Sequence, residues 1–326
     1  MKKLFATLAS VLMVAVLAVS MAACSQGERI RVLDIPLSGE RYGFTVSQND
    51  AELMTAVNSL IEDLCGSAPF DSNDPENDHG AVGVQYDLDG DGTEETVTFA
   101  TLYAAIQEDA AVDGEEKLSV KDVYTDIPSG KTEEDCLIVA TNAQFKPFEY
   151  KIGNGFGGID MHIAKMLANQ LGNKTLVVKD MEFDVVIQNV GTGQADIGMA
   201  GLTISEGRAE SVNFSDPYFE TSQSLAVLES DTTFDGCTTR EDVEEVLAGL
   251  QGAVAGAANG QTGYWYLVGS QDFAFSGFSN IETRSYTSLD LALQDLSNGK
   301  VDFVIGDKDP VTSISAEING RIPVEE

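Results

Sequence analysis

Residues 137–150 read LIVATNAQFKPFEY, and they open the stretch that decides the fold. The stretch continues with GGIDMHIAKMLANQLG at 157–172, MEFDVVIQNVGTGQADIGMAGLTISEGR at 181–208 and VNFSDPYFETSQSLAV at 212–227. A short apolar run at 137–140 predicts a buried strand, and apolar residues at helical spacing within 160–171 predict a helix. Strand and helix patterns keep alternating after this point, which is typical of an α/β fold with mostly parallel strand pairing.

In this order and spacing, the four segments resemble the solute-binding proteins of ABC importers, in the family-3 branch that captures polar and charged amino acids. The resemblance implies a two-lobed fold of the periplasmic-binding-protein-like II type. Each lobe is then a mixed sheet flanked by helices, and two hinge crossovers join the lobes. Residues 135–226 correspond to lobe I and residues 227–326 to lobe II. The implied function is capture of a free amino acid between the lobes and its delivery to an ABC permease in the membrane.

The family pattern normally continues past the position of Glu326, and residues 30–64 resemble the part that would follow. They read IRVLDIPLSGERYGFTVSQNDAELMTAVNSLIEDL. We therefore predict a circularly permuted domain, in which residues 24–65 are the family's C-terminal tail; such permutation requires old termini that lie close together. It predicts a lobe I strand at 42–46, a lobe II strand at 31–34 and a closing helix at 52–64. The alternative is a remnant of a duplicated domain that packs independently.

The first residues resemble the signal peptide of a bacterial lipoprotein. A basic start at Met1-Lys2-Lys3 precedes an apolar run at 4–19 that is too short to span a bilayer comfortably. The following Met21-Ala22-Ala23-Cys24 resembles a lipobox. We predict a signal peptide at 1–23 and a lipid on Cys24 that anchors the protein outside the cytoplasmic membrane. The alternative is ordinary secretion with Cys24 unmodified.

Composition narrows the function classes further. The formal net charge of −34 argues against nucleic acid and against anionic lipid surfaces as partners. Only two histidines are present, which argues against histidine-based catalysis and against a multi-histidine metal site. We expect no required cofactor.

A free amino acid carries a carboxylate and an ammonium group on one carbon. Its site therefore needs a bidentate cation, backbone donors and an anion. The resemblance assigns Arg208 to the carboxylate and Asp307 to the ammonium. It also implies that Thr203 donates its N–H and hydroxyl, and that the Gly201 carbonyl accepts from the ammonium.

Further contacts implied by the resemblance surround this core of the site. Gln261 and Thr262 would open a helix whose N–H groups favour a carboxylate, and Phe145 and Phe183 would sandwich the ligand's carbon skeleton. Asn142 stands where the family tunes side-chain recognition. A site for lysine or arginine often has a carboxylate there, so the neutral amide favours an uncharged polar ligand. The family more often has threonine where Gln261 stands.

Residues 66–134 contain eighteen acidic residues and three lysines. We expect this inserted segment to lie outside the core of either lobe, as an appended unit that joins the old ends of the domain. Cys65 and Cys136 would stand at that junction, where they either form a disulfide or stay free.

The inserted segment includes DLDGDGTEE at 87–95, between runs at 81–86 and 96–102 that predict strands. The sequence resembles a calcium loop, because hard cations take several oxygen ligands around a sharp glycine turn. The candidate ligands for a structural calcium are Asp87, Asp89, Asp91 and Glu95. The alternative is an acidic, solvated hairpin turn, for which Asp-Gly is already a good signal.

Two other function classes remain open. One is an enzyme on the same fold, similar to the cyclohexadienyl dehydratases, which need a carboxylate poised over the leaving group. Glu149 and Glu182 are the candidates for that role. The other is a calcium-dependent adhesion module, which leaves the amino-acid constellation without a purpose.

Overall fold

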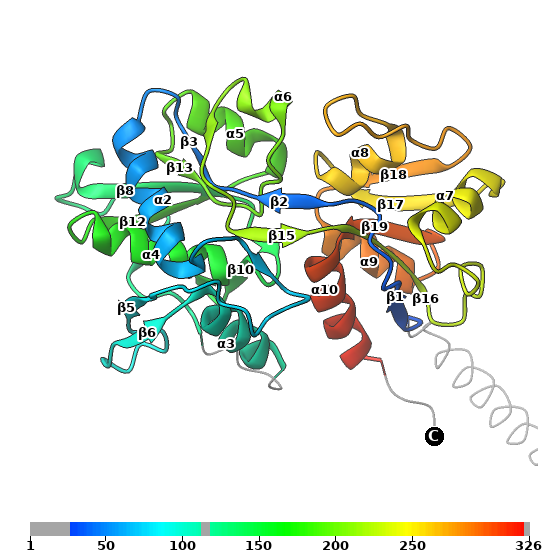
Figure 1. Ribbon diagram of the computed structural model, residues 1–326, viewed down its shortest axis with the longest axis horizontal. Coiled ribbons are helices and arrows are strands. Elements are labelled where there is room, and N and C mark those ends of the chain that lie inside the picture. The colour runs from blue at the N-terminus through cyan, green and yellow to red at the C-terminus, as the bar shows by residue number, and fades with distance from the viewer. Residues whose placement is uncertain (1–26, 112–117, 323–326) are drawn as a thin grey trace, which may run out of the picture.

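The computed structural model describes residues 27–111 and 118–322, which form two lobes lying side by side (Figure 1). Each lobe contains one mixed sheet with helices against it, and strands β2 and β15 run between the lobes (Figure 1). The predicted two-lobed α/β fold is therefore confirmed. Within the described ranges, no helix is long and apolar enough to cross a membrane. The predicted signal peptide and Cys24 lie outside the described residues.

Lobe I is built on a six-stranded sheet. Its order is β14 (Asn213–Phe214), β3 (Thr45–Val46), β13 (Ile197–Gly198), β8 (Cys136–Thr141), β12 (Thr175–Asp180) and β7 (Val123–Tyr124). The central strand β8 is buried along its whole length and pairs in parallel with β12 and β13. Its alternate side chains face opposite sides of the sheet. Val139 packs with the helices α2 (Ala51–Cys65) and α4 (Ile159–Gln170), whereas Ile138 packs with α5 (Phe183–Gly191).

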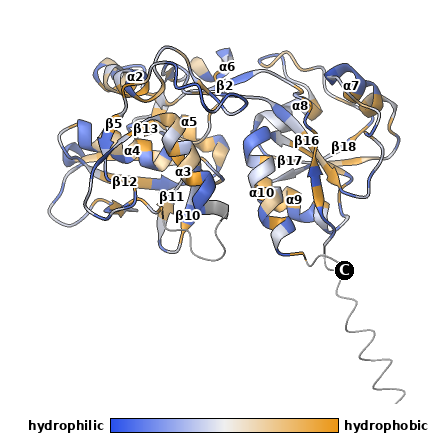
Figure 2. Ribbon diagram, turned by 60° about the horizontal axis from the view of Figure 1, so that its bottom comes forward, coloured by the Kyte–Doolittle hydropathy of each residue, from blue (hydrophilic) through white to orange (hydrophobic). Residues whose placement is uncertain are grey.

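Lobe II is built on a five-stranded sheet. Its order is β1 (Ile30–Val32), β16 (Gln223–Leu228), β19 (Phe303–Asp307), β17 (Val254–Ala258) and β18 (Glu282–Tyr286), the last of which the sequence did not predict. The helices α7 (Arg240–Gly249) and α8 (Thr262–Val268) cluster with Phe303, and α9 (Leu289–Ser297) and α10 (Lys308–Gly320) with Val304. Hydrophobic residues gather along the strands inside each lobe (Figure 2).

Three strands form the hinge sheet: β2 (Glu40–Tyr42), β15 (Phe219–Thr221) and β4 (Phe70–Asp71). β2 carries the chain from β1 in lobe II to β3 in lobe I, and β15 carries it back toward β16. β1 pairs with β16, with Ile30 opposite Leu228, and β3 pairs with β13. The two predicted strands before residue 50 thus join different lobes, and α2 covers the predicted helix at 52–64.

The expectation that residues 66–134 lie outside both cores is wrong. Strand β7 forms an edge of the lobe I sheet, and β4 pairs with β15 in the hinge. Helix α3 (Phe99–Ala111) buries Phe99, Leu102 and Ile106 in the main hydrophobic cluster. The strand predicted at 96–102 is shorter, because β6 (Glu95–Val97) pairs with β5 (Val84–Tyr86) and α3 then begins. A high average charge does not exclude an amphipathic helix with one apolar face.

The inserted segment also touches lobe II beside the hinge. The Tyr103 hydroxyl donates to Asp309 Oδ1 at 2.7 Å, and Ser72 Oγ donates to Asp309 Oδ2 at 3.3 Å. Lys308 Nζ donates to Asn73 Oδ1 at 2.7 Å. Both lobe II residues begin α10, so the segment contacts both lobes. The remaining short elements are β9 (Gln144–Phe145), β10 (Glu149–Ile152), β11 (Gly155–Gly157), α6 (Glu206–Ala209) and the 3-10 helix at Glu133–Asp135.

The disulfide between Cys65 and Cys136 is not formed, because both are free, buried thiols. Cys65 belongs to the cluster on the α2 and α4 side of the lobe I sheet. Cys136 belongs to the cluster on the α5 side. The sheet lies between the two sulfur atoms, although the junction of the chain segments brings their backbones into the same lobe.

Replacing Leu102 with Ala tests the role of the inserted segment. Leu102 is fully buried, and emptying its place should lower the free energy of unfolding by about 2–5 kcal/mol in urea titrations. The exposed Glu108 on the same helix is the control, and E108A should change stability by less than about 0.5 kcal/mol. Unchanged stability of L102A would mean that α3 packs outside the cooperative core.

Candidate functional site

The two lobes meet beside the hinge, and most of the predicted ligand residues lie at this meeting. Arg208 is on α6 of lobe I, and Asp307 ends β19 of lobe II. Arg208 reaches the Gly260 carbonyl just before α8, and α8 packs on β19, so the two residues come to this meeting from opposite lobes as predicted. Thr262 Oγ1 lies 3.2 Å from Thr203 Oγ1, which joins the first turn of α8 to lobe I. The lobes therefore touch at this point.

Arg208 spans the gap between the lobes. Ser205 caps the short helix α6, and this cap sets the direction of the arginine side chain. Arg208 Nη1 donates to the Thr203 carbonyl at 2.8 Å, and Nη2 donates to the Gly260 carbonyl of lobe II at 3.1 Å. The guanidinium carbon lies 5.4 Å from the Phe183 ring and 5.4 Å from the Phe273 ring. Burial lowers the pKa of Arg208, against the opposing effect of nearby carboxylates, of which Glu40 acts most strongly.

Asp307 is a buried carboxylate with a neutral partner. Gln223 Nε2 donates to Asp307 Oδ1 at 3.0 Å, and the fully buried Tyr42 lies beside it. Burial, and next the negative charge of Glu40, raise the pKa of Asp307 from its ordinary value of 3.8 to about 8. An ammonium group placed here would relieve the cost of burying this charge.

Gly201 and Phe145 pack against each other. Gly201 has φ +52°, and a Cβ there would approach the Phe145 ring to 2.6 Å, so only glycine fits. The Gly201 N–H donates to Asp160 Oδ2 at 3.2 Å, and Tyr218 donates to Asp160 Oδ1 at 2.9 Å. Burial raises the pKa of Asp160 to about 7. Asp160 thus holds the backbone that leads into Thr203.

Three of the predicted ligand residues, Asn142, Gln261 and Phe183, are buried in this structure, and two of them contact other protein groups. Asn142 is buried, and its amide Nδ2 donates to the Met181 carbonyl at 2.8 Å. Its donor is therefore used within lobe I. Gln261 precedes α8 as its N-cap residue and is buried, with Oε1 making no hydrogen bond to any described residue. Phe183 retains 9% exposure and stacks on Arg208.

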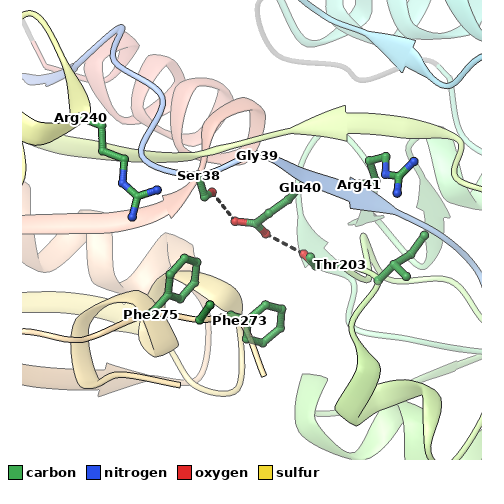
Figure 3. A pocket seen from close by; sticks show the side chains of 10 residues that line it. Ser38, Gly39, Glu40, Arg41, Thr203, Arg240, Phe273 and Phe275 are labelled. Atoms are coloured by element: carbon green, nitrogen blue, oxygen red, sulfur yellow. Dashed lines mark hydrogen bonds between the residues drawn. The ribbon is translucent and has the colours of Figure 1, made fainter. Parts of the chain in front are cut away.

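Sequence reasoning missed Glu40. This residue lies on the hinge strand β2, where Ser38 Oγ donates to Glu40 Oε1 at 2.5 Å and Thr203 Oγ1 donates to Oε2 at 2.9 Å (Figure 3). It faces a cavity of about 380 Å³ that Phe273 and Phe275 also line. The permutation itself was the available signal. A strand that runs from lobe II at 31–34 to lobe I at 42–46 must cross the hinge, which brings residues 38–41 to the cleft.

A loop of lobe II also reaches lobe I. Asp272 Oδ1 accepts from the Gly207 N–H at 2.7 Å, and the neighbouring Phe273 covers Arg208. The loop lies close to Gly207, because a Cβ there would meet the Asp272 carboxyl carbon at 2.9 Å. A second cavity, of about 730 Å³, opens beside this loop and includes Arg208, Phe183 and Trp265 in its wall.

The acidic hairpin brings three of its four candidate ligands together. Carboxylate oxygens of Asp87, Asp89 and Asp91 lie within 4.8 Å of one another. Glu95 is not in this group; it stands in β6, opposite Tyr86. Glu95 is already part of the strand, so it lies outside the turn that holds the three aspartates. The spacing of acidic residues in the sequence did not reveal this difference.

The two carboxyl groups considered for catalysis differ in access. Glu149 is fully buried, and burial, followed by repulsion from Asp160, raises its pKa well above the usual range. Glu182 is exposed and precedes α5. His162 is fully buried, and its Nδ1 lies 3.0 Å from the Tyr86 hydroxyl of the inserted segment.

Comparisons with known proteins show what the chain is similar to. Residues 137–263 match the sequence pattern of the bacterial extracellular solute-binding proteins, family 3. The chain is 35% identical over 115 residues to the arginine-binding extracellular protein ArtP of Bacillus subtilis, across 35% of this chain and 43% of that protein. It is 30% identical over 173 residues to a probable histidine-binding protein of Neisseria gonorrhoeae, across 52% and 58%.

Among solved structures, holo ArgBP from T. maritima matches with 30% identity and a TM-score of 0.47, across 57% of this chain and 74% of that chain. The chain spans about half the length of the curated relatives named above.

The raised pKa of Asp307 predicts a pH-dependent stability difference. Its folded-state pKa lies above its ordinary value, so ionisation destabilises the folded, ligand-free protein above about pH 8, and this cost disappears as the pH falls toward 4. Asp307→Asn removes the charge. The melting temperature of D307N minus that of the wild type should be positive at about pH 9 and shrink toward pH 5. The control is the exposed hinge residue Glu220, as Glu220→Gln. A difference independent of pH would mean that Asp307 does not ionise in the cleft.

Proposed function

The chain belongs to the bacterial extracellular solute-binding proteins of family 3, and on that premise we propose that it captures a polar or charged amino acid for an ABC importer. The observation that carries this proposal is the convergence of Arg208 from lobe I and Asp307 from lobe II. A guanidinium from one lobe and a carboxylate from the other complement the carboxylate and ammonium of an amino acid. A permease in the membrane is the proposed partner.

Capture follows from the position of these charges on opposite lobes. Arg208 now bonds two backbone carbonyls, and a ligand carboxylate would offer it a stronger, charged acceptor. The ligand's ammonium would balance the desolvated Asp307. A molecule that bridges both lobes stabilises the closed arrangement over the open one, and this difference drives closure.

Binding without chemistry is the proposed outcome of closure. A general acid must reach the substrate within hydrogen-bond distance, and Glu149 has no exposed surface. Glu182 is exposed at the start of α5 but is not among the residues lining either cavity. The relatives named above are described as binding proteins.

The names of the relatives, which refer to arginine and histidine, favour a basic amino acid as the ligand. We extend that ligand class to this chain. It departs from the uncharged ligand expected from Asn142, whose amide donor is spent on the Met181 carbonyl. A carboxylate elsewhere in the cleft must then take the place of the one that Asn142 lacks.

Two proposals concern the arrangement of the chain. Residues 24–65 are the family's C-terminal tail moved ahead of its head; the pairing of β1 with β16 and of β3 with β13 supports this. The family pattern begins at residue 137, after the inserted segment 66–134. Cys24 carries the lipid that keeps the protein at the membrane next to its permease, and the lipobox-like sequence before it supports this.

A thermal-shift screen with all proteinogenic amino acids tests the function. A specific ligand at a hundredfold excess over its dissociation constant should stabilise the protein by about 2.7 kcal/mol. Arg208→Ala leaves a desolvated carboxylate without its partner, which costs about 2–5 kcal/mol, so affinity by calorimetry should fall at least about tenfold. The partly exposed Arg284 on β18, away from the cleft residues named above, is the control, as R284A. Full-strength binding by R208A, or no hit in the screen, would reject the proposal.

We also propose that the acidic hairpin binds calcium. Asp87, Asp89 and Asp91 offer three carboxylates, and the Gly92 N–H orients one of them by donating to Asp87 Oδ2 at 3.0 Å. Hard cations favour such oxygen clusters, and the mutual repulsion of the carboxylates would be relieved by the ion. The hairpin lies in lobe I, away from the residues that line the cleft.

Calcium should therefore slow proteolysis within residues 86–98 and leave amino-acid affinity unchanged. Asp89→Asn should abolish the protection, because it removes one of the three charges. The control is Asp122→Asn, because Asp122 is an acidic residue of the same segment that lies outside the hairpin. If calcium does not change the cleavage rate, the hairpin is a solvated turn; if chelation abolishes amino-acid binding, the ion belongs to the ligand site.

A further inference from the structure

Two carboxylates and one guanidinium share the hinge end of the cleft. Glu40 accepts from the Thr203 hydroxyl, and Arg208 donates to the carbonyl of the same Thr203. Thr203 therefore joins Glu40 to Arg208, and Asp307 lies within electrostatic reach of both. Counting these side chains as ionised, the group carries one net negative charge.

Among the residues that the structure describes, neither carboxylate has a cationic partner within 4.0 Å. Glu40 accepts from the hydroxyls of Ser38 and Thr203, and Asp307 accepts from the amide of Gln223. Arg208 donates its two hydrogen bonds to the carbonyls of Thr203 and Gly260. Removing an ionised carboxylate from water costs free energy unless a cation pairs with it, and a bound cation would offset that cost.

The charges of the ligand can be matched against this group. An amino acid with an uncharged side chain brings one ammonium and one carboxylate, and it leaves one carboxylate of the cleft unbalanced. An amino acid with a cationic side chain brings two positive groups and one negative group. Those charges complement the two carboxylates and the guanidinium one for one, which favours the cationic ligand in a water-poor cleft.

We infer that Glu40, on the hinge strand β2, is the residue that selects a basic amino acid, by pairing with the cationic end of the ligand's side chain. The inference rests on the proposed function and concerns the same cleft. Asp307 is left for the ligand's ammonium and Arg208 for its carboxylate. Glu40 thereby supplies the negative charge that Asn142 lacks.

The space beside Glu40 fits such a side chain. The cavity of about 380 Å³ lies within the 300–1,000 Å³ range of small-molecule sites. Phe273 and Phe275 form one wall, and their rings can take a flat cationic group (Figure 3). Two further arginines line the cavity. Arg240 lies at the far side, and its Nε donates to Glu244 Oε1 at 2.6 Å, so its charge is already paired. Arg41 follows Glu40 on β2 and is exposed, so water screens its charge.

The test uses the full chain with Glu40→Gln, which keeps the shape and removes the charge. Calorimetric titrations compare arginine, lysine and histidine with citrulline, the uncharged isostere of arginine. The wild type should prefer the basic amino acids. E40Q should lose about tenfold or more in affinity for them and stay within about threefold for citrulline. The control is Glu220→Gln, because Glu220 is exposed on the facing hinge strand β15 and should leave all affinities unchanged.

Each other result overturns the inference. Tighter binding of every ligand by E40Q would mean that Glu40 competes with the ligand for the Thr203 hydroxyl. Equal weakening for arginine and citrulline would mean that Glu40 only supports the hinge. A wild type that binds uncharged or acidic amino acids but no basic one would refute the role of Glu40 while the proposed function stands. A wild type that binds no amino acid at all would refute the proposed function itself.

Discussion

The antiparallel pairing of β2 with β15 is the constraint on which the cleft depends. Tyr42 lies opposite Phe219 and Glu40 opposite Thr221. Side chains alternate along a strand, so Glu40 and Tyr42 share one face of β2 and the intervening Arg41 belongs to the other. The chain leaves this crossing directly into β16, where Gln223 stands opposite Asp307. A slip of one residue in the hinge register would turn Glu40 to the opposite face of the strand.

Electrostatics inside the cleft differ from those of the protein as a whole. The net charge of −34 is carried mostly by exposed side chains, where water screens it. Inside, burial decides: it raises the pKa of Asp307 to about 8 and that of Asp160 to about 7. Asp160 uses its acceptor oxygens to hold Gly201 and Tyr218. The buried Asp160 thus supports the backbone of the site. The buried Asp307 would be stabilised by a bound cation.

The inserted segment is tied to the hinge through aromatic packing. The rings of Phe70 and Phe99 each lie 5.9 Å from the ring of Phe219 on β15. Tyr103 stacks on Phe219 as well, at 6.1 Å, and its hydroxyl reaches Asp309 of lobe II. Opening of the lobes must therefore keep or break contacts that a family member without this segment would not have. The inserted segment therefore packs against the hinge and contacts lobe II, and it is not a separate appendage.

Much of the architecture could be predicted from the sequence, because it depends on local patterns. Alternating apolar runs indicated the strands β8, β12 and β13 and the helices between them, and the order of motifs indicated two lobes. The pattern at 30–64 was sufficient to send β1 and β3 to different sheets. The inserted segment was misjudged because summed charge hides the apolar face of α3, which only packing against α2 and α4 exposes as core.

The candidate site shows the same difference between what local sequence patterns indicate and what packing decides. The family resemblance was sufficient to name Arg208, Thr203 and Asp307 as candidates, and the structure places Arg208 and Thr203 where the lobes meet. The sequence left the disulfide open and grouped Glu95 with the aspartates, because both questions depend on which face of a sheet, or which side of a strand, a residue occupies. Glu40 belongs to no motif, and its importance arises where a strand from one lobe passes the threonine of the other. The sequence by itself determined which chemical groups are available in this chain. Only the tertiary structure decided which charges lie together and which remain without a partner, because burial and proximity between distant segments arise only when the two lobes pack across the hinge.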